Sequence, residues 1–133
     1  MSQEVKVVIN QVSASASKGT ARQHAVLCDR PEAKGGTDQG AMGGELFLLG
    51  LGGCFMSNLL AAVKTREEKV GELTVEVVAT LADSPQRFTA IDLRVGGQYS
   101  DKDLLHKLVT IAERGCIVAN SIRNSVKLSF SIV

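Results

Sequence analysis

The longest uncharged stretch of the chain, residues 46–63, restricts the possible folds more than any other feature of the sequence. Apolar residues occupy every side of a helix with 3.6 residues per turn over this stretch, so we predict a central helix that is buried all round. The stretch also reaches the lower limit for a membrane span. Gly50, Gly52 and Gly53 favour a core helix, because glycine lets a neighbouring backbone approach closely. A small membrane-anchored protein is the alternative, which recovery without detergent would exclude.

The size and charge of the chain narrow the classes of function. At 133 residues, a single domain over residues 1–133 can bury its own hydrophobic core. The formal net charge is +1, and no basic run is longer than two residues. Aromatic residues that stack on nucleic-acid bases are scarce, with four Phe, one Tyr and no Trp. We therefore expect neither a nucleic acid nor an acidic membrane as a partner.

The cysteines indicate a reducing compartment. Cys28, Cys54 and Cys116 are odd in number and match neither a secreted disulfide framework nor a zinc-binding pattern. The first residues show no export signal, so we expect a cytoplasmic protein. His24 and His106 stand far apart in the sequence, and we expect no metal and no other cofactor.

Short apolar and alternating runs predict the elements around the central helix. Before it, we expect a β-meander with strands at residues 5–9, 12–16 and 22–28 and a turn at residues 18–20. After it, we expect strands at residues 73–81, 88–95 and 126–132, a turn at residues 83–86, a helix from the N-cap Ser100 to residue 113, and a short helix or turn at residues 116–122. The order βββαββααβ is typical of α+β proteins rather than of βαβ units.

A loop at residues 29–42 leads into the central helix. It contains one proline, three glycines and several charges, and we expect it to lack secondary structure. Long loops in compact domains are often functional, so it could be a lid or a dimer arm. A mobile surface connection is the alternative.

Local chemistry ranks the three thiols by reactivity. Cys54 lies among apolar residues inside the predicted helix, where burial raises a thiol pKa, and a small core residue is its simplest interpretation. Cys116 follows Gly115 at the start of a predicted helical turn, where free N–H groups favour a thiolate, so it should be the more reactive thiol. Cys28 lies in an alternating strand and is expected to be inert.

Two charged residues precede Cys54 and could assist it. Glu45 lies nine residues earlier, which on an unbroken helix is the opposite face. It would reach Cys54 only if the glycines folded it back or a second subunit presented it; otherwise its carboxylate favours the helix N-terminus. Arg22 shares a face of the predicted strand with His24, Val26 and Cys28, so it approaches the central helix if that face does.

Two blocks of the sequence carry a resemblance to a known family. Residues 44–55 end a leucine-rich run on Gly53 and Cys54, and residues 112–121 place Gly115 and Cys116 before a Val-Ala-Asn-Ser sequence. These blocks resemble the osmotically inducible protein C and organic hydroperoxide resistance proteins (OsmC/Ohr), and the loop at residues 29–38 is similar too. The resemblance implies an α+β, OsmC-like two-layer fold, with antiparallel sheets wrapped around a long buried central helix. It also implies an intertwined homodimer with two sites at the subunit interface.

The resemblance further implies a thiol peroxidase that reduces organic hydroperoxides as an antioxidant in stress responses. Cys54 would be the peroxidatic thiolate, oxidised to a sulfenic acid, and Cys116 the resolving thiol that closes a Cys54–Cys116 disulfide. An external dithiol, such as a lipoyl group, would reduce the disulfide. Cys54 would then need a cation to lower its pKa, which the family supplies as an arginine held by a glutamate. Here these roles fall to Arg22 and Glu45.

The sequence departs from the family pattern at three places, one of which is the entry to the central helix, where Met42 and Gly43 replace the usual proline-containing residues. Glu45 stands one position after the family's acid, which falls on Gly44, and Ile117 stands where the family has proline. These departures motivate the second hypothesis, a non-enzymatic OsmC-like dimer that binds a small apolar ligand or senses redox state.

Overall fold

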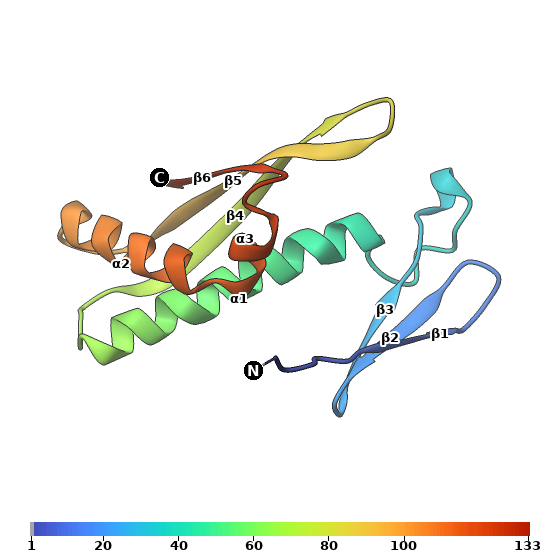
Figure 1. The fold of residues 1–133 in the computed structure, drawn as a ribbon, viewed down its shortest axis with the longest axis horizontal. Helices are drawn as coiled ribbons and strands as arrows, with labels where there is room; N and C mark the ends of the chain where they lie inside the picture. Colours follow the sequence, from blue (N-terminus) through green and yellow to red (C-terminus); the bar gives the residue numbers. More distant parts are fainter. Residues whose placement is uncertain (1) are drawn as a thin grey trace. The chain divides into compact units, whose positions relative to one another are not determined.

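The computed structural model describes residues 2–133, and the chain divides after residue 47 into two compact units (Figure 1). The first unit contains β1 (Val8–Gln11), β2 (Ser17–Ala21), β3 (His24–Cys28) and the short 3₁₀ helix η1 (Glu32–Lys34). The helix α1 (Gly43–Thr65) begins in this unit and continues into the second. The second unit also contains β4 (Gly71–Ala82), β5 (Arg87–Gln98), α2 (Lys102–Gly115), α3 (Ile117–Ile122) and β6 (Lys127–Ile132).

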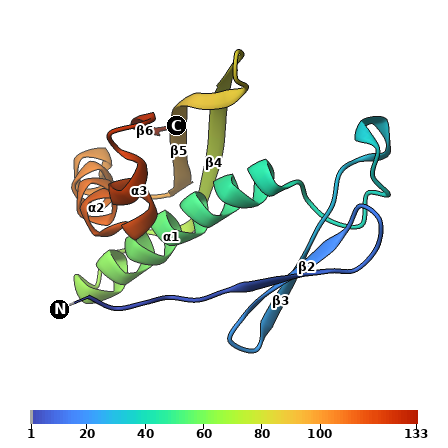
Figure 2. The ribbon, with the colours of Figure 1, turned by 45° about the vertical axis from the view of Figure 1, so that its right-hand side comes forward.

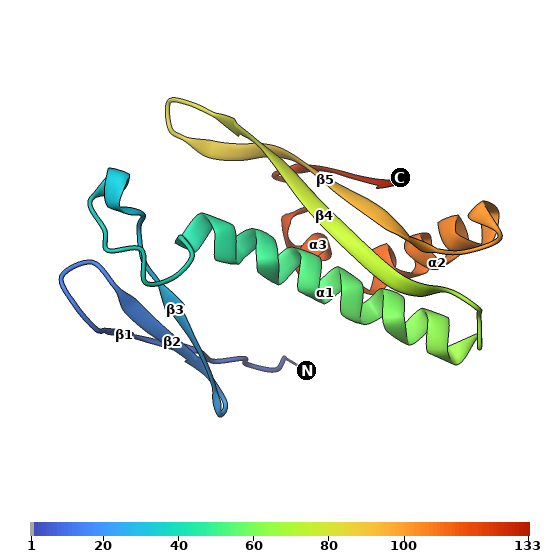
Figure 3. The ribbon, with the colours of Figure 1, turned by 180° about the vertical axis from the view of Figure 1, so that it is seen from behind.

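The predicted β-meander is confirmed, with antiparallel strands in the order β1-β2-β3, but the strand predicted at residues 12–16 is instead the turn between β1 and β2 (Figure 3). The predicted turn at residues 18–20 lies inside β2. The turn between β1 and β2 is instead built by the Ser13 hydroxyl, which accepts the N–H of Ser15 at 3.3 Å and of Ala16 at 3.0 Å. Serine does this commonly, because its oxygen reaches the backbone two or three residues ahead.

Arg22 is not a strand residue, which corrects the argument from a shared strand face. The pairing of Ala21 with His24 closes the hairpin, so Arg22 and Gln23 form the turn between β2 and β3. Arg22 has a φ of 55°, in the left-handed region where most side chains are disfavoured. Glycine and asparagine, which usually mark such a turn, are absent here, so the turn was not predictable from the residue types.

The loop after β3 is folded, not structureless as predicted. The buried Asp29 carboxylate accepts hydrogen bonds from the Thr37 hydroxyl at 2.7 Å and from the N–H groups of Arg30, Thr37 and Gln39. A Cβ atom at Gly36 would collide with the Arg30 carbonyl oxygen, so this turn requires glycine. The loop is therefore wound tightly around one carboxylate, and η1 lies within it.

The long central helix is confirmed and is continuous. It buries Leu51, Phe55, Leu59 and Ala62, which repeat at helical spacing on one side. Other apolar residues remain exposed, including Leu49 at 64% and Leu60 at 52%, so the second unit alone does not bury the helix all round. By length and composition α1 could also cross a membrane, and 28% of its most apolar part is buried.

The sheet of the second unit contains one parallel pair that the sequence analysis did not predict. Its order is β4-β5-β6, with β4 antiparallel and β6 parallel to β5. The two helices α2 and α3 carry the chain back before β6 begins, so β6 runs in the direction of β5. The expectation of purely antiparallel sheets is therefore wrong for this pair, while the predicted hairpin of β4 and β5 is confirmed.

The helices of the second unit lie on one face of this sheet (Figure 2). Ile91, Leu93 and Val95 of β5 point into a core with residues of α1, α2 and α3. The rings of Phe55 and Phe130 pack within it, with their centroids 5.1 Å apart. Strand alternation predicted this inward face correctly, because successive side chains of a strand point to opposite sides.

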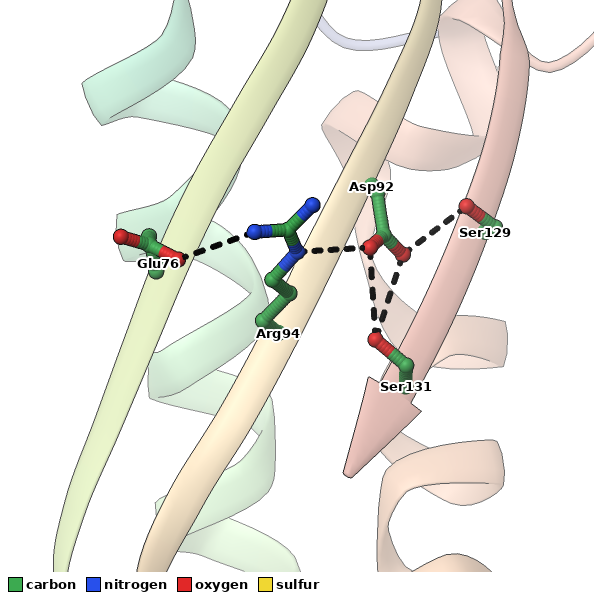
Figure 4. Close-up of polar contacts among 5 residues, drawn as sticks. All are labelled: Glu76, Asp92, Arg94, Ser129 and Ser131. Carbon is green, nitrogen blue, oxygen red and sulfur yellow. Dashed lines mark hydrogen bonds and ion pairs between the residues drawn. The ribbon is translucent and has the colours of Figure 1, made fainter. Parts of the chain in front are cut away.

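The opposite face of the sheet carries a polar network (Figure 4). Asp92 accepts hydrogen bonds from Arg94 at 3.0 Å and from the hydroxyls of Ser129 and Ser131, and Arg94 also reaches Glu76 at 3.4 Å. The Arg94 and serine hydrogen bonds outweigh the effect of burial and lower the pKa of Asp92. These contacts link all three strands on the face away from the core.

Candidate functional site

The second unit brings Cys54 and Cys116 together, although they lie far apart in the sequence. Cys54 is in the middle of α1, and Cys116 joins α2 to α3 as the N-cap of α3. Both are free thiols, and they lie close enough that each acts on the pKa of the other. The packing of α1 against α2 and α3 around one core therefore brings the two thiols close together.

Hydrogen bonds favour the thiolate of Cys54. Burial raises the pKa of the Cys54 thiol, but the N–H groups of Val118 and Ile117 and the Cys116 thiol donate to its sulphur and leave the pKa below its ordinary value. These donors belong to the first turn of α3, whose N–H groups have no partner inside the helix. A positive side chain is thus not required to lower the pKa of this thiol.

The pKa of the Cys116 thiol is raised, in contrast to that of Cys54. Its side chain is fully buried, and burial raises the pKa of its thiol, as does the neighbouring Cys54 sulphur. Its sulphur accepts the Ala119 N–H at 3.5 Å, which opposes the rise without cancelling it. The prediction that Cys116 is the more acidic thiol is therefore wrong, because the foremost N–H groups of α3 point at Cys54.

Asn58 also contacts Cys54 and was not among the residues predicted from the sequence. It lies one helical turn after Cys54 on α1; its amide nitrogen is 2.9 Å from the Cys54 carbonyl oxygen and 3.9 Å from the Cys54 sulphur. The signal was its position four residues after a cysteine, a spacing that places two side chains on the same helix face.

Glu45 and Arg22 both belong to the first unit. The Glu45 carboxylate accepts the Met42 N–H at 2.9 Å, as an acid in the first turn of a helix often does. Because α1 is continuous from Gly43 to Thr65, the glycines do not fold Glu45 back toward Cys54. Arg22 lies in the β2–β3 turn.

The remaining candidate ligands do not form a cluster. Cys28 is half-buried at the end of β3, while His24 and His106 are exposed on β3 and α2. Within residues 2–133, no group of three or more His, Cys, Asp or Glu side chains is placed to hold a metal ion.

Comparisons with known proteins place this fold in one family. The family model of the OsmC-like protein matches residues 36–131. No curated protein matches the chain. Among solved structures, an OsmC-like protein from Mycoplasma pneumoniae is similar with a TM-score of 0.86 and 14% identity, over 100% of this chain and 98% of that one.

Two further structures are named as organic hydroperoxide resistance proteins. The one from Elizabethkingia anophelis has a TM-score of 0.76 and 17% identity, over 99% of this chain and 96% of that one. The one from Bacillus subtilis has a TM-score of 0.73 and 19% identity, over 98% of each chain. At these identities the similarity establishes the fold, whereas the family model, which covers most of the sequence, establishes that this chain belongs to the OsmC-like protein family.

Proposed function

We propose that this protein is a cysteine-based peroxidase that reduces organic hydroperoxides. The observation that carries the proposal is the contact between Cys54, whose pKa is lowered, and Cys116, whose pKa is raised. A thiolate beside a protonated thiol is the arrangement that a two-cysteine redox cycle needs. Family membership and the neighbours named for organic hydroperoxide resistance support a substrate of this class.

In the first step, the Cys54 thiolate attacks the terminal oxygen of the hydroperoxide. A sulphur–oxygen bond forms while the oxygen–oxygen bond breaks, so the sulphur is oxidised by two electrons to a sulfenic acid. The alkoxide leaves and takes a proton from solvent to become an alcohol. The hydrogen bonds that hold the thiolate favour this step, because the thiolate is the nucleophile.

In the second step, the Cys116 sulphur attacks the oxidised Cys54 sulphur and releases water. The product is the Cys54–Cys116 disulfide, and the proximity of the two thiols at one core supports direct closure. An external dithiol, such as a lipoyl group, then reduces the disulfide by thiol exchange and becomes a disulfide itself. No metal or organic cofactor takes part in this cycle.

The family resemblance gives Arg22 the role of a guanidinium near Cys54 and Glu45 that of the carboxylate that holds it; because α1 is continuous, Glu45 can take this role only if a second subunit presents it. Arg22→Gln tests this part of the proposal separately from the cysteine cycle. A slower oxidation of Cys54 by hydroperoxide is the expected result. An unchanged rate would remove Arg22 from the mechanism and leave Cys54 activated by hydrogen bonds alone.

The active form in this proposal is a homodimer in the cytoplasm. Exposed apolar residues occur on α1, among them Leu49 and Leu60, and on the first sheet, among them Ile9 and Val26. Such surfaces are uncommon on monomers and support contact with a second copy. Proteins of this family are soluble, so α1 is a core helix rather than a membrane span. Three free thiols support a reducing compartment.

The test is the consumption of cumene hydroperoxide with dihydrolipoamide by the wild type, Cys54→Ser and Cys116→Ser. Turnover is expected in the wild type and in Cys28→Ser, the matched control for the third thiol. It should be lost in the other two variants. Turnover no faster than that of a free thiol would contradict the proposal.

A second candidate function is a non-enzymatic dimer that binds an apolar ligand or senses redox state. An apolar hollow of about 290 Å³ on the first sheet, lined by residues that include Val7, Ile9 and Val26, favours it. Saturable binding of a fluorescent fatty acid without hydroperoxide turnover would support this alternative.

A further inference from the structure

Asn58 lies between the two segments that carry the cysteines. Its amide nitrogen donates to the Cys54 carbonyl oxygen, which fixes the orientation of the amide, because an oxygen in that place would face another oxygen. An amide nitrogen has two hydrogens, and the second is available to the Cys54 sulphur, 3.9 Å away.

The other end of the same side chain faces Gly115. A Cβ atom built on Gly115 would lie 2.9 Å from the Asn58 carbonyl oxygen, closer than such atoms approach in proteins. Glycine at residue 115 therefore makes room for Asn58 immediately before Cys116. One side chain thus contacts Cys54 on one side and the backbone that carries Cys116 on the other.

We propose that Asn58 is a positioning residue for the Cys54 thiolate, whose sulphur it holds by an amide hydrogen bond while its carbonyl oxygen rests against Gly115. The inference rests on the proposed function, in which the Cys54 thiolate attacks the substrate. Asn58 adds a third kind of donor to the backbone N–H groups and the Cys116 thiol. The Cys116 thiol is the titratable group that acts on Cys54 among the described residues.

The direction in which Asn58 variants change the pKa of Cys54 follows from the negative charge of the thiolate. A hydrogen bond to the charged form of a thiol lowers its pKa, so loss of the amide raises the pKa of Cys54. A carboxylate in the same place raises it further, because a negative charge beside the sulphur disfavours the thiolate. Asn58→Ala removes the donor, and Asn58→Asp replaces it with an acceptor of the same shape.

The experiment measures alkylation of Cys54 by iodoacetamide as a function of pH, with the labelled peptide quantified by mass spectrometry. This readout reports the thiolate without any hydroperoxide. Asn58→Ala is expected to slow labelling of Cys54 at pH 7 by about threefold to tenfold, and Asn58→Asp by more. The midpoint of the pH profile should move to higher pH in both variants.

Two further variants make the test specific. Asn120→Ala is the matched control, because the Asn120 amide donates to the Arg114 carbonyl oxygen at 3.1 Å, near Cys116 but not to the Cys54 sulphur. Gly115→Ala keeps the amide but displaces it, and should move the Cys54 profile in the same direction as Asn58→Ala. This variant keeps the proposal testable if Asn58→Ala does not fold.

A Cys54 profile that stays unchanged in a folded Asn58 variant would overturn the inference, as would an equal change in Asn120→Ala. If the profile shifts as expected but the wild type consumes no hydroperoxide, the inference on Asn58 stands and the proposed function fails. The two outcomes are therefore distinguishable.

Discussion

The ionisation of the Cys54 thiol depends on a few hydrogen bonds that neighbouring residues donate to it. Ile117 supplies one of them through its backbone N–H, in a position where the family motif has proline. Proline has no N–H, so isoleucine here gives Cys54 one donor that proline would not. The departure from the motif therefore favours the thiolate and does not argue against a reactive cysteine.

Replacing Ile117 with proline removes this single donor. Proline is well tolerated as the first residue of a helix, and Cys116 before it has the extended backbone that precedes proline (φ −79°, ψ 110°). The Ile117 side chain is 75% exposed, so little packing is lost. Ile117→Pro should slow alkylation of Cys54 at pH 7 by about threefold to tenfold.

Ile117→Ala is the control for this substitution, because it shortens the side chain and retains the N–H. Its alkylation rate should match that of the wild type. Equal slowing in both variants would show that the side chain of Ile117, and not its N–H, affects Cys54.

The proximity of Cys54 and Cys116 was expected from the sequence, but the order of their acidity was not. The blocks around Cys54 and Cys116 indicated a pair through their resemblance to a family. The order of acidity was not predictable from local rules, because the N–H groups that follow Cys116 in the chain act on Cys54 of a different helix. Asn58 was missed for the same reason, since its contact with Gly115 exists only in the folded chain.

The loop wound around Asp29 makes the stability of the first unit depend on pH. The Thr37 hydroxyl and backbone N–H groups hold the pKa of Asp29 well below its ordinary range. A carboxyl group with a depressed pKa in the folded state stabilises the fold above its unfolded pKa of about 4, and this contribution is lost as the pH falls toward its folded value.

Asp29→Asn should lower the melting temperature at pH 7 by several degrees, because an amide accepts fewer of these hydrogen bonds. The difference from the wild type should shrink as the pH falls below about 4. Asp38→Asn is the matched control in the same loop, since Asp38 is exposed and asparagine tolerates its φ of 54°. A difference from the wild type that does not vary with pH would contradict the role of the Asp29 charge.

The close approach of α1 to β4 at Gly52 allows a prediction about the stability of the protein. A Cβ atom at Gly52 would lie 2.9 Å from a Val77 methyl group. Gly52→Ala should therefore lower the free energy of unfolding by about 1 kcal/mol, because overpacking outweighs the gain in helix propensity.

A double-mutant cycle checks that this contact is the cause. Val77→Ala removes the methyl group, so the combination with Gly52→Ala should cost less than the two single changes added together, by about 1 kcal/mol. Strict additivity in urea denaturation would show that Gly52 does not contact Val77 closely.

The patterns along each element predicted the type of element better than the way the elements join. Alternation in β4 and β5 gave the hairpin and its inward face. Nothing local indicated that β6 pairs in parallel with β5, since this depends on the path through α2 and α3. The β2–β3 turn was missed because Arg22 takes a left-handed conformation that usually calls for glycine or asparagine.

The proposed dimer predicts the effect of a charge on the exposed face of α1. Leu60→Lys should convert dimers into monomers in sedimentation velocity, because a charge at an apolar interface is costly to desolvate. His106→Lys, on an exposed position of α2, is the control and should leave the mass unchanged. A wild type that sediments as a monomer at micromolar concentration would contradict the dimer.

The central claim is that two distant cysteines form one redox site. Its most direct test is mass spectrometry of the protein after one equivalent of cumene hydroperoxide, with peptides mapped without reduction. A Cys54–Cys116 disulfide is expected in the wild type, and a sulfenic acid on Cys54 is expected in the Cys116→Ser variant. Three free thiols after this treatment would contradict it.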